Sequence, residues 1–499
     1  MSAVVAVDLG ATSGRVILGY VGDGEVRMQH VARFPNQPVR VYEGRADADA
    51  DAGAGAAAGQ ASGEAAFGLH WNILELYRSV GAGLRSALRD EPDVVSIGVD
   101  SWAVDYALLR GGRMLGAPYN YRDERTTAGV AAVHSVVGPA ELYRLNGLQH
   151  LPFNSLFQLA ADRASGDLAL ADTVLLIPDL LGYWLTGVGV AEITNASTTG
   201  LLNPHTRGWD AELMTRLGLP AGLLPRLAEP GSSLGRLLPE VASDLGAGPG
   251  VGVTLVGSHD TASAVVAVPA TDDDFAYISS GTWSLVGVEL ESPVVSEEGR
   301  AANFTNEGGV DGRVRYLKNV SGLWLLSESV RTWERASGTP IELAELLARA
   351  SAVTAPVSVF DAADDRFITP GDMPSRIADW CREHGVAVPQ NPAEFTRSIL
   401  ESLAVAYATT VQQAAELTGK TVSAIHIVGG GSLNELLCQL TADRTGLTVL
   451  AGPVEATAIG NILVQARAAG MVPVGSSLEA LRAVVSATFR PTRYRPRGR

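Results

Sequence analysis

The chain has 499 residues, of which 46% are hydrophobic and 18% charged; this composition is globular, and the length exceeds one ordinary core. The net charge of −16 argues against a nucleic-acid partner but permits a bound nucleotide, because a helix N-terminus can hold phosphate on an acidic protein. No uncharged apolar run reaches the ~18 residues of a membrane span, so we expect no membrane partner.

The N-terminus lacks a basic, cleavable signal, and Cys381 and Cys438 have no metal-ligand spacing. We therefore expect a cytoplasmic protein with two reduced thiols and no zinc site.

The first half of the chain predicts strands and helices in alternation. Residues 4–10 form an apolar strand, 11–14 a turn and 15–21 a second strand. Residues 44–68 contain almost no aromatic or branched apolar residues and predict a flexible surface loop. The elements expected next are a helix at 73–88, a strand at 94–100 and an alternation of helices and short loops over 128–250.

The second half repeats this organisation. A strand over 251–257 leads into a helix from Thr261, and residues 275–290 predict two strands around a Ser-Ser-Gly-Thr turn. Then come a helix at 395–418, a strand at 424–431, a helix at 434–446, a strand at 448–452 and a helix at 455–469. Each half thus opens on a strand, a polar glycine turn and a strand, which indicates a duplicated α/β architecture with helical crossovers. The basic, proline-containing tail 488–499 is expected to fray.

Three glycine-containing turns are candidates for contacting phosphates or a nucleotide. In the first, Asp8 ends a buried strand and could hold Mg²⁺, directly or through water, while the turn amides of residues 10–14 face phosphate oxygens. The second is Ser279–Trp283, and the third is the glycine triplet within residues 428–432, where the missing Cβ atoms let a nucleotide approach. Each of these turns taken alone could be an ordinary surface turn.

A histidine and an aspartate stand where an apolar strand enters an apolar helix, in the sequence GSHDTASA at 257–264. Asp260 could be a plain N-cap of that helix, or a base at the mouth of a cleft. A carboxylate at a helix N-terminus is expected to be kept ionised by the helix dipole, so the two roles are compatible.

Taken together, these motifs resemble the FGGY carbohydrate kinases of the actin/Hsp70-like ATPase superfamily, in particular the branch that phosphorylates L-rhamnulose. The resemblance runs from residue 4 to about 466 and rests on VAVDLGATSGR, SIGVDSWAVDYALL, YRDERT, LPFNSLFQL, EITNASTTGLLN, GSHDTASAV, YISSGTWSLVG, NFTNEGG, LKNVSGLWLL, HIVGGGSLNELL and AGPVEATAIGNI. It implies an α/β fold of two ribonuclease-H-like domains flanking a catalytic cleft. The sugar-binding domain would span residues 1–267, the nucleotide-binding domain 275–470 and a C-terminal extension 471–499.

The resemblance also implies a role for individual residues. Asp260 would be the proton acceptor when ATP, with Mg²⁺ near Asp8, phosphorylates O1 of L-rhamnulose. The substrate contacts would be Ala103, His259, Asp260, Thr261 and Asn319. The ATP contacts would be Ala11, Thr12, Ser13, Gly14, Arg15, Thr282, Ser327 and Gly430. Two of these positions depart from the family pattern, which has glycine at position 103 and glutamine at position 327.

Residue chemistry suggests further members of a sugar pocket. Trp102 and Phe153 suit the apolar side of a sugar, and Asp105 and Asn154 suit its hydroxyl groups, although both aromatic residues could equally be core residues.

Other functions stay open at this point: a kinase for another ketose (fuculose, xylulose or ribulose), an ATP-binding module without sugar chemistry, or a decayed kinase used as a sensor. The His-Asp-Thr motif favours a kinase, because a module without a hydroxyl acceptor has no need of it. The chain is expected to be a monomer or a homodimer.

Overall fold

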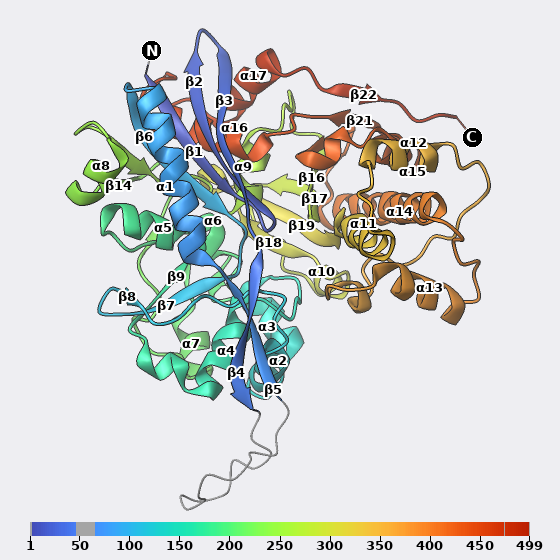
Figure 1. Cartoon of the computed structure of the whole chain (residues 1–499), viewed down its shortest axis with the longest axis horizontal. Helices are drawn as coiled ribbons and strands as arrows, with labels where there is room; N and C mark the ends of the chain where they lie inside the picture. Colours follow the sequence, from blue (N-terminus) through green and yellow to red (C-terminus); the bar gives the residue numbers. More distant parts are fainter. Residues whose placement is uncertain (1, 46–64, 474, 499) are drawn as a thin grey trace, which may run out of the picture.

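The computed structural model describes residues 2–45, 65–473 and 475–498. Two mixed β-sheets form its centre, and most of the yellow and orange second half of the chain lies to the right of the blue and green first half (Figure 1). The first sheet has the order β14-β15-β6-β1-β2-β3. Its strands are β1 (Ala3–Leu9), β2 (Ser13–Gly22), β3 (Glu25–Pro35), β6 (Val94–Ser101), β14 (Ser233–Arg236) and β15 (Gly252–Thr254).

The second sheet has the order β18-β19-β17-β16-β20-β21-β22. Its strands are β16 (Phe275–Ser280), β17 (Trp283–Leu290), β18 (Thr305–Gly308), β19 (Val314–Ser321), β20 (Ala424–Val428), β21 (Thr448–Ala451) and β22 (Thr492–Tyr494).

Five strands of each sheet share one pattern. In the first sheet β1 pairs antiparallel with β2 and parallel with β6. Strand β3 then pairs antiparallel with β2, and β15 pairs parallel with β6. In the second sheet β16 pairs antiparallel with β17 and parallel with β20. Strand β19 then pairs antiparallel with β17, and β21 pairs parallel with β20. The predicted duplication is confirmed, and it puts the β1–β2 and β16–β17 turns at equivalent places in the two halves.

Helices cover the faces of both sheets. They are α1 (Ile73–Asp90), α5 (Ile177–Thr186), α9 (Asp260–Val266), α11 (Trp324–Ser337), α12 (Leu343–Ser351), α13 (Met373–Glu383), α14 (Pro392–Thr418), α15 (Glu435–Thr445), α16 (Ala456–Ala468) and α17 (Leu478–Thr488). The longest, α14, starts where the Asn391 side chain accepts the first free N–H groups, and it ends at Gly419 in the left-handed conformation. The bounds of α14, α15 and α16 agree to within a few residues with the helices predicted at 395–418, 434–446 and 455–469.

Strand β1 is buried on both faces, as its unbroken apolar sequence predicts. Val5 and Val7 face the core that contains α1, whereas Val4 and Ala6 face α9 and α16. Thus α16, which is nearly the last helix of the chain, packs on the first sheet. The same core cluster includes Phe275 and other residues of the second sheet, so the two sheets share it.

Residues between β6 and β15 form a smaller region beside the first sheet. Its elements are β7 (Tyr106–Arg110), β8 (Arg113–Met114), β9 (Thr173–Leu176), β10 (Ala191–Glu192), β11 (Leu202–Asn203), β12 (Gly208–Trp209), β13 (Leu227–Ala228), α2 (Thr126–His134), α3 (Pro139–Asn146), α4 (Ser155–Ser165), α6 (Ile193–Ala196), α7 (Ala211–Arg216) and α8 (Pro239–Leu245). The predicted alternation of helices and loops therefore also contains short strands. A further short helix, α10 (Glu297–Ala301), precedes β18.

The structure corrects two of the sequence expectations. The ends of the predicted loop 44–68 belong to an antiparallel hairpin, β4 (Pro38–Arg45) and β5 (Ala65–Trp71), which projects at the bottom of Figure 1; residues 46–64 lie outside the described residues. The tail does not simply fray, because β22 pairs with β21, and Arg497 forms an ion pair with Asp443. An open sheet edge offers unpaired backbone groups that such a tail can satisfy.

Candidate active site

Two hairpin turns, one from each sheet, line a common cavity of about 320 Å³. In the β1–β2 turn, the N–H of Gly10 donates to the carbonyl of Ser13 at 2.9 Å, and Asn36 braces the turn through the Gly10 carbonyl. In the β16–β17 turn, the N–H of Gly281 donates to Trp283 at 2.9 Å. The predicted residues that line the cavity are Asp8, Ala11, Thr12, Ser13, Arg15, Trp102, Ala103, Phe153, Asn154, His259, Asp260, Thr261, Thr282, Asn319 and Gly430.

Asp260 is the first residue of α9 and opens into this cavity, with 30% of its side chain exposed. It is not the cap of the helix: His259 occupies the N-cap position and makes no side-chain cap bond. Instead the Asp260 carboxylate accepts a hydrogen bond from the Thr261 hydroxyl at 3.2 Å. Of the two roles that the sequence left open for Asp260, the N-cap position is therefore occupied by His259, and the Asp260 carboxylate faces the cavity.

Burial raises the pKa of Asp260 above its ordinary value, although the neighbouring His259 and the Thr261 hydroxyl oppose the rise. The shift of this pKa is opposite to that expected from the helix dipole, because the cost of removing the carboxylate from water exceeds the stabilisation that a helix of seven residues gives to it. A raised pKa makes the carboxylate a stronger proton acceptor once it is ionised, which suits a general base.

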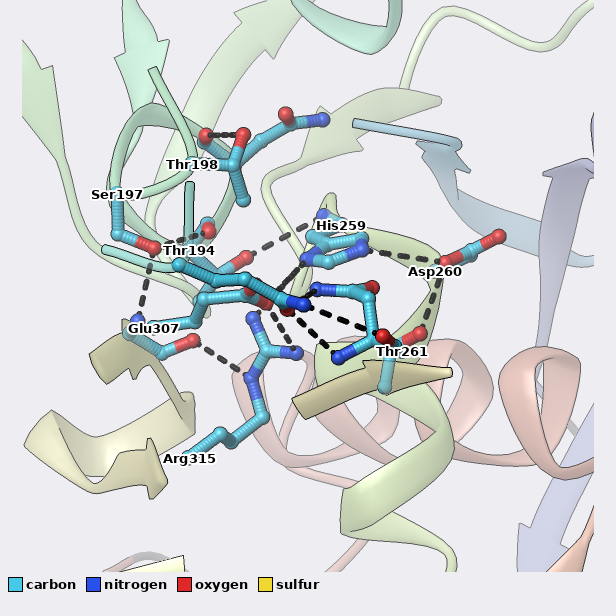
Figure 2. Close-up of polar contacts among 12 residues, drawn as sticks. Thr194, Ser197, Thr198, His259, Asp260, Thr261, Glu307 and Arg315 are labelled. Carbon is cyan, nitrogen blue, oxygen red and sulfur yellow. Dashed lines mark hydrogen bonds and ion pairs between the residues drawn. The ribbon is translucent and has the colours of Figure 1, made fainter. Parts of the chain in front are cut away.

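His259 is held by residues from three parts of the chain (Figure 2). Its backbone N–H donates to the hydroxyl of Thr194 at 3.3 Å. Its Nδ1 lies 3.0 Å from Nη2 of Arg315 and 3.3 Å from Oε2 of Glu307, and its Nε2 lies 3.5 Å from Oδ1 of Asp260. The imidazole is thus fixed between a buried ion pair and the candidate base.

Two further carboxyl groups lie beside the first hairpin. Asp8 and Asp100 are register partners on the parallel strands β1 and β6, and both are buried. Burial raises the pKa of Asp8 to about 6, against the opposing charge of Arg15, whose Nη1 lies 3.5 Å away. Burial and the charge of Asp8 raise the pKa of Asp100 well above its ordinary value, and Asn461 of α16 donates to Asp100 at 2.5 Å. Arg15 is also bonded to Glu455.

The turn after β6 presents Trp102 and Ala103 to the cavity in a strained conformation. The next residue, Val104, has a φ of +67°, which is costly for a β-branched residue. Asp105 accepts hydrogen bonds from the indole N–H groups of Trp71 at 2.6 Å and Trp102 at 3.0 Å, and from the N–H of Tyr121 at 3.1 Å. Asp105 is therefore committed to supporting the turn.

Asn319 on β19 is held by Gln149. Its backbone N–H and its side-chain amide donate to Oε1 of Gln149 at 2.7 and 3.0 Å, and the Gln149 amide donates back to the Asn319 carbonyl at 3.2 Å. These three hydrogen bonds connect the loop before α4 to the second sheet.

Models of two protein domains match most of the chain: the N-terminal domain of the FGGY family of carbohydrate kinases matches residues 65–267, and the C-terminal domain of that family matches residues 276–469. The chain belongs to the FGGY family of carbohydrate kinases. The cavity lies where both matched domains contribute residues, as expected for a kinase with its cleft between two domains.

Relatives within the FGGY family are similar along nearly the whole chain. A rhamnulokinase of Bacteroides thetaiotaomicron is 40% identical over 98% of this chain and 95% of its own length. A rhamnulokinase of Pectobacterium atrosepticum is 42% identical over 99% of this chain and 93% of its own.

Solved structures of a xylulose kinase and a glycerol kinase share the fold. A xylulose kinase from Lactobacillus acidophilus superposes with a TM-score of 0.74 at 17% identity, covering 100% of this chain and 94% of its own. A Plasmodium falciparum glycerol kinase with ADP gives a TM-score of 0.73 at 14% identity, covering 99% of this chain and 94% of its own. Within the described residues, no helix is long and apolar enough to cross a membrane.

Three residues assigned from the FGGY resemblance or from residue chemistry do not line the cavity formed by the described residues: Gly14, Asp105 and Ser327. Gly14 gives room to Phe34, whose ring would lie 2.2 Å from a Cβ atom at that position. Ser327 is exposed on α11 and lies outside the cavity. Its position, and not only the shortness of its side chain, keeps its hydroxyl from the cavity. Asp105 supports Trp102 instead of facing a sugar.

Four residues of this FGGY site had no role in the sequence analysis: Gln149, Glu307, Arg315 and Glu455. Glu307 and Glu455 fall within the stretches NFTNEGG and AGPVEATAIGNI, on which the family resemblance rests. The resemblance therefore indicated the segments in which these two residues lie, but not their roles. Their function depends on partners far away in sequence, which no local pattern reveals.

Proposed function

We propose that the protein transfers the γ-phosphoryl group of ATP to O1 of L-rhamnulose, with Asp260 as the general base. The observation that carries this proposal is the place of Asp260: a carboxylate with a raised pKa opens into a cavity between two equivalent hairpin turns. The relatives at about 40% identity, which carry the name rhamnulokinase, support L-rhamnulose as the acceptor.

In the proposed reaction the residues position the reactants and move one proton. Asp260 takes the proton from the O1 hydroxyl as that oxygen attacks the γ-phosphorus; the bond from phosphorus to the bridging oxygen breaks, and ADP leaves. The amides of the β1–β2 and β16–β17 turns would hold the phosphates from two sides, with Gly429 and Gly430 beside the nucleoside. Trp102, Thr261 and Asn319 would position the sugar.

Asp8 fits the role of partner to a Mg²⁺ ion. Its Oδ2 is buried and accepts no hydrogen bond among the described residues, with Nη1 of Arg15 3.5 Å away as its ion-pair partner. A carboxylate oxygen is a ligand that Mg²⁺ prefers. The cation would neutralise charge on the phosphates. We place the reaction in the cytoplasm, where the buried thiols of Cys381 and Cys438 would stay reduced.

The test measures ADP release with ATP and Mg²⁺, without sugar and with L-rhamnulose, L-fuculose, D-xylulose and L-ribulose. We expect turnover mainly with L-rhamnulose, and we expect Asp260→Asn to lower kcat by ~10²–10⁴-fold, the typical contribution of a general base. Identification of the product by NMR checks that O1 carries the phosphate.

Other outcomes separate the alternatives. Preference for another ketose would keep the mechanism and change the substrate, with Ala103 the first residue to exchange for glycine. Sugar-independent turnover that Asp260→Asn leaves intact would refute the kinase proposal and favour an ATP-binding module.

A further inference from the structure

The buried pair of Glu307 and Arg315 has no direct part in the phosphoryl transfer described above. The two residues are register partners on the antiparallel strands β18 and β19, with Arg315 Nη1 and Glu307 Oε2 3.2 Å apart. The side chain of Arg315 is 0% exposed, and that of Glu307 is 6% exposed. Buried charges of this kind are costly unless they are paired, so their position beside His259 calls for an explanation.

The contact between Arg315 and His259 determines the hydrogen-bonding role of one ring nitrogen. A guanidinium group carries N–H donors and no acceptor, so Nδ1 of His259, 3.0 Å from Nη2 of Arg315, must accept. A ring nitrogen that accepts carries no proton, so the proton of the neutral imidazole is on Nε2. Nε2 is the nitrogen that lies 3.5 Å from Oδ1 of Asp260.

Glu307 offers the competing arrangement. Its Oε2 lies 3.3 Å from the same Nδ1 and would accept a proton from it, which would leave Nε2 bare toward Asp260. The shorter contact belongs to Arg315, which also donates through Nε to the carbonyl of Gly308 at 2.9 Å and is thereby fixed in direction. Figure 2 shows both side chains converging on His259 from the side opposite Asp260.

We propose that Arg315 and Glu307 are positioning residues that hold His259 as the Nε2–H tautomer, with this N–H directed at Asp260. Arg315 supplies the donor to Nδ1, and Glu307 neutralises Arg315. In this tautomer neither ring nitrogen is free to take the proton of a substrate hydroxyl. His259 is then a hydrogen-bond donor in the cavity, and Asp260 is left as the base. This consequence for catalysis rests on the proposed function, whereas the tautomer itself does not.

The first experiment observes the tautomer directly in the full-length protein. Long-range ¹H–¹⁵N NMR of ¹⁵N-histidine-labelled protein distinguishes protonated from unprotonated ring nitrogens, and His259→Gln assigns the signals among the eight histidines. At neutral pH we expect a protonated Nε2 and an unprotonated Nδ1. A protonated Nδ1, alone or together with Nε2, would overturn the proposal, whatever sugar the protein phosphorylates.

Variants test the cause. Arg315→Met removes every donor at that position, so we expect Nδ1 to become protonated and to donate to Glu307; Arg315→Lys should restore the Nε2–H form. The matched control is Glu289→Gln, which breaks another buried pair, Glu289 with Arg482 at 2.8 Å, outside the cavity lining, and should leave the His259 signals unchanged. An unchanged tautomer in Arg315→Met would refute the assignment. If that variant does not fold, the wild-type and Arg315→Lys spectra decide the question.

Kinetics gives a second readout. We expect Arg315→Met to lower kcat by about 10- to 100-fold, by analogy with the loss of hydrogen-bond partners of metal-binding histidines, with the KM for ATP unchanged. Glu289→Gln should lose stability without this loss of kcat. Equal losses of kcat in the two variants would show that Arg315 serves only to stabilise the fold.

Discussion

Asp260 lies among charges of both signs, and these charges determine how its activity should depend on pH. Asp8 on β1 and Asp100 on β6 interact with it unfavourably, while His259 and Arg315 favour its ionised form. Burial is the largest influence, and the net pKa is raised. Because a base must be ionised to accept a proton, kcat/KM should fall as the pH falls through this raised pKa.

Removing the two members of the buried pair should move this acidic limb in opposite directions. Glu307→Gln leaves the Arg315 charge without its neutralising partner, which stabilises the Asp260 carboxylate and moves the limb to lower pH. Arg315→Met removes the favourable charge and moves the limb to higher pH. The measurement is kcat/KM against pH for both variants, with Glu289→Gln as the control. A shift in the same direction for both would contradict the electrostatic account.

The strained turn at Val104 leads to a prediction for Asp105. The N–H groups of Trp71, Trp102 and Tyr121 all donate to Oδ2 of Asp105. The Gln158 amide donates to the other oxygen, Oδ1, at 2.9 Å, so asparagine, which has one acceptor oxygen, leaves a buried donor unpaired. We expect Asp105→Asn to cost about 1–3 kcal/mol of stability and to raise the KM for the sugar through misplacement of Trp102. Urea unfolding and steady-state kinetics measure the two effects. A loss of stability with an unchanged KM would separate Asp105 from the sugar pocket.

Sequence reasoning succeeded for residues in local motifs and failed where a partner was remote. Asp260 and most of the turn residues could be placed in the cavity because strand, glycine turn and helix start are local patterns, whereas Gly14 of the first turn faces Phe34. The supporting role of Asp105 could not be predicted, since Trp71 and Tyr121 come near it only in the folded chain. Arg315 likewise looks like any strand arginine until β18 and β19 pair.

Among the elements, contact between α9 and α16 keeps Asp260 in place. A Cβ atom at Gly460 would lie 1.8 Å from the backbone oxygen of Ser263 on α9, so Gly460→Ala must push the helices apart. We expect a loss of about 1–3 kcal/mol, the usual cost of overpacking, together with a lower kcat. In contrast, Gly81→Ala on α1 meets nothing closer than 3.8 Å and should gain about 0.5–1 kcal/mol. Thermal and urea unfolding compare the two; equal effects would contradict this packing argument.

The elements that sequence reasoning missed are those fixed by their surroundings. Strands β4 and β5 extend into both ends of a stretch whose composition predicts a loop, and β22 exists because β21 is an open edge. In both cases backbone pairing, which is largely independent of side-chain pattern, decided the structure. The central strands could be predicted because their burial on both faces requires continuous apolar sequence.

For the molecule as a whole, the shared core makes the first sheet dependent on the end of the chain. A chain that stops after residue 451 lacks α16 and leaves Val4, Ala6 and Ile17 without the part of their cover that α16 provides. We expect it to aggregate or to lose its cooperative unfolding transition, whereas a chain that stops after residue 490 keeps α16 and α17 and should remain folded. Circular dichroism melts and limited proteolysis compare the two. A cooperative transition in the shorter chain would contradict the dependence.

The packing of α16 on β1 also sets the timing of folding during protein synthesis. The ribosome synthesises β1 long before α16, so until α16 emerges the face of the first sheet that contains Val4 and Ala6 lacks part of its cover. The uncovered apolar surface makes such a nascent chain prone to aggregate. We therefore expect it to need a chaperone until α16 has been synthesised. In this protein the order of translation and the order of packing run in opposite directions.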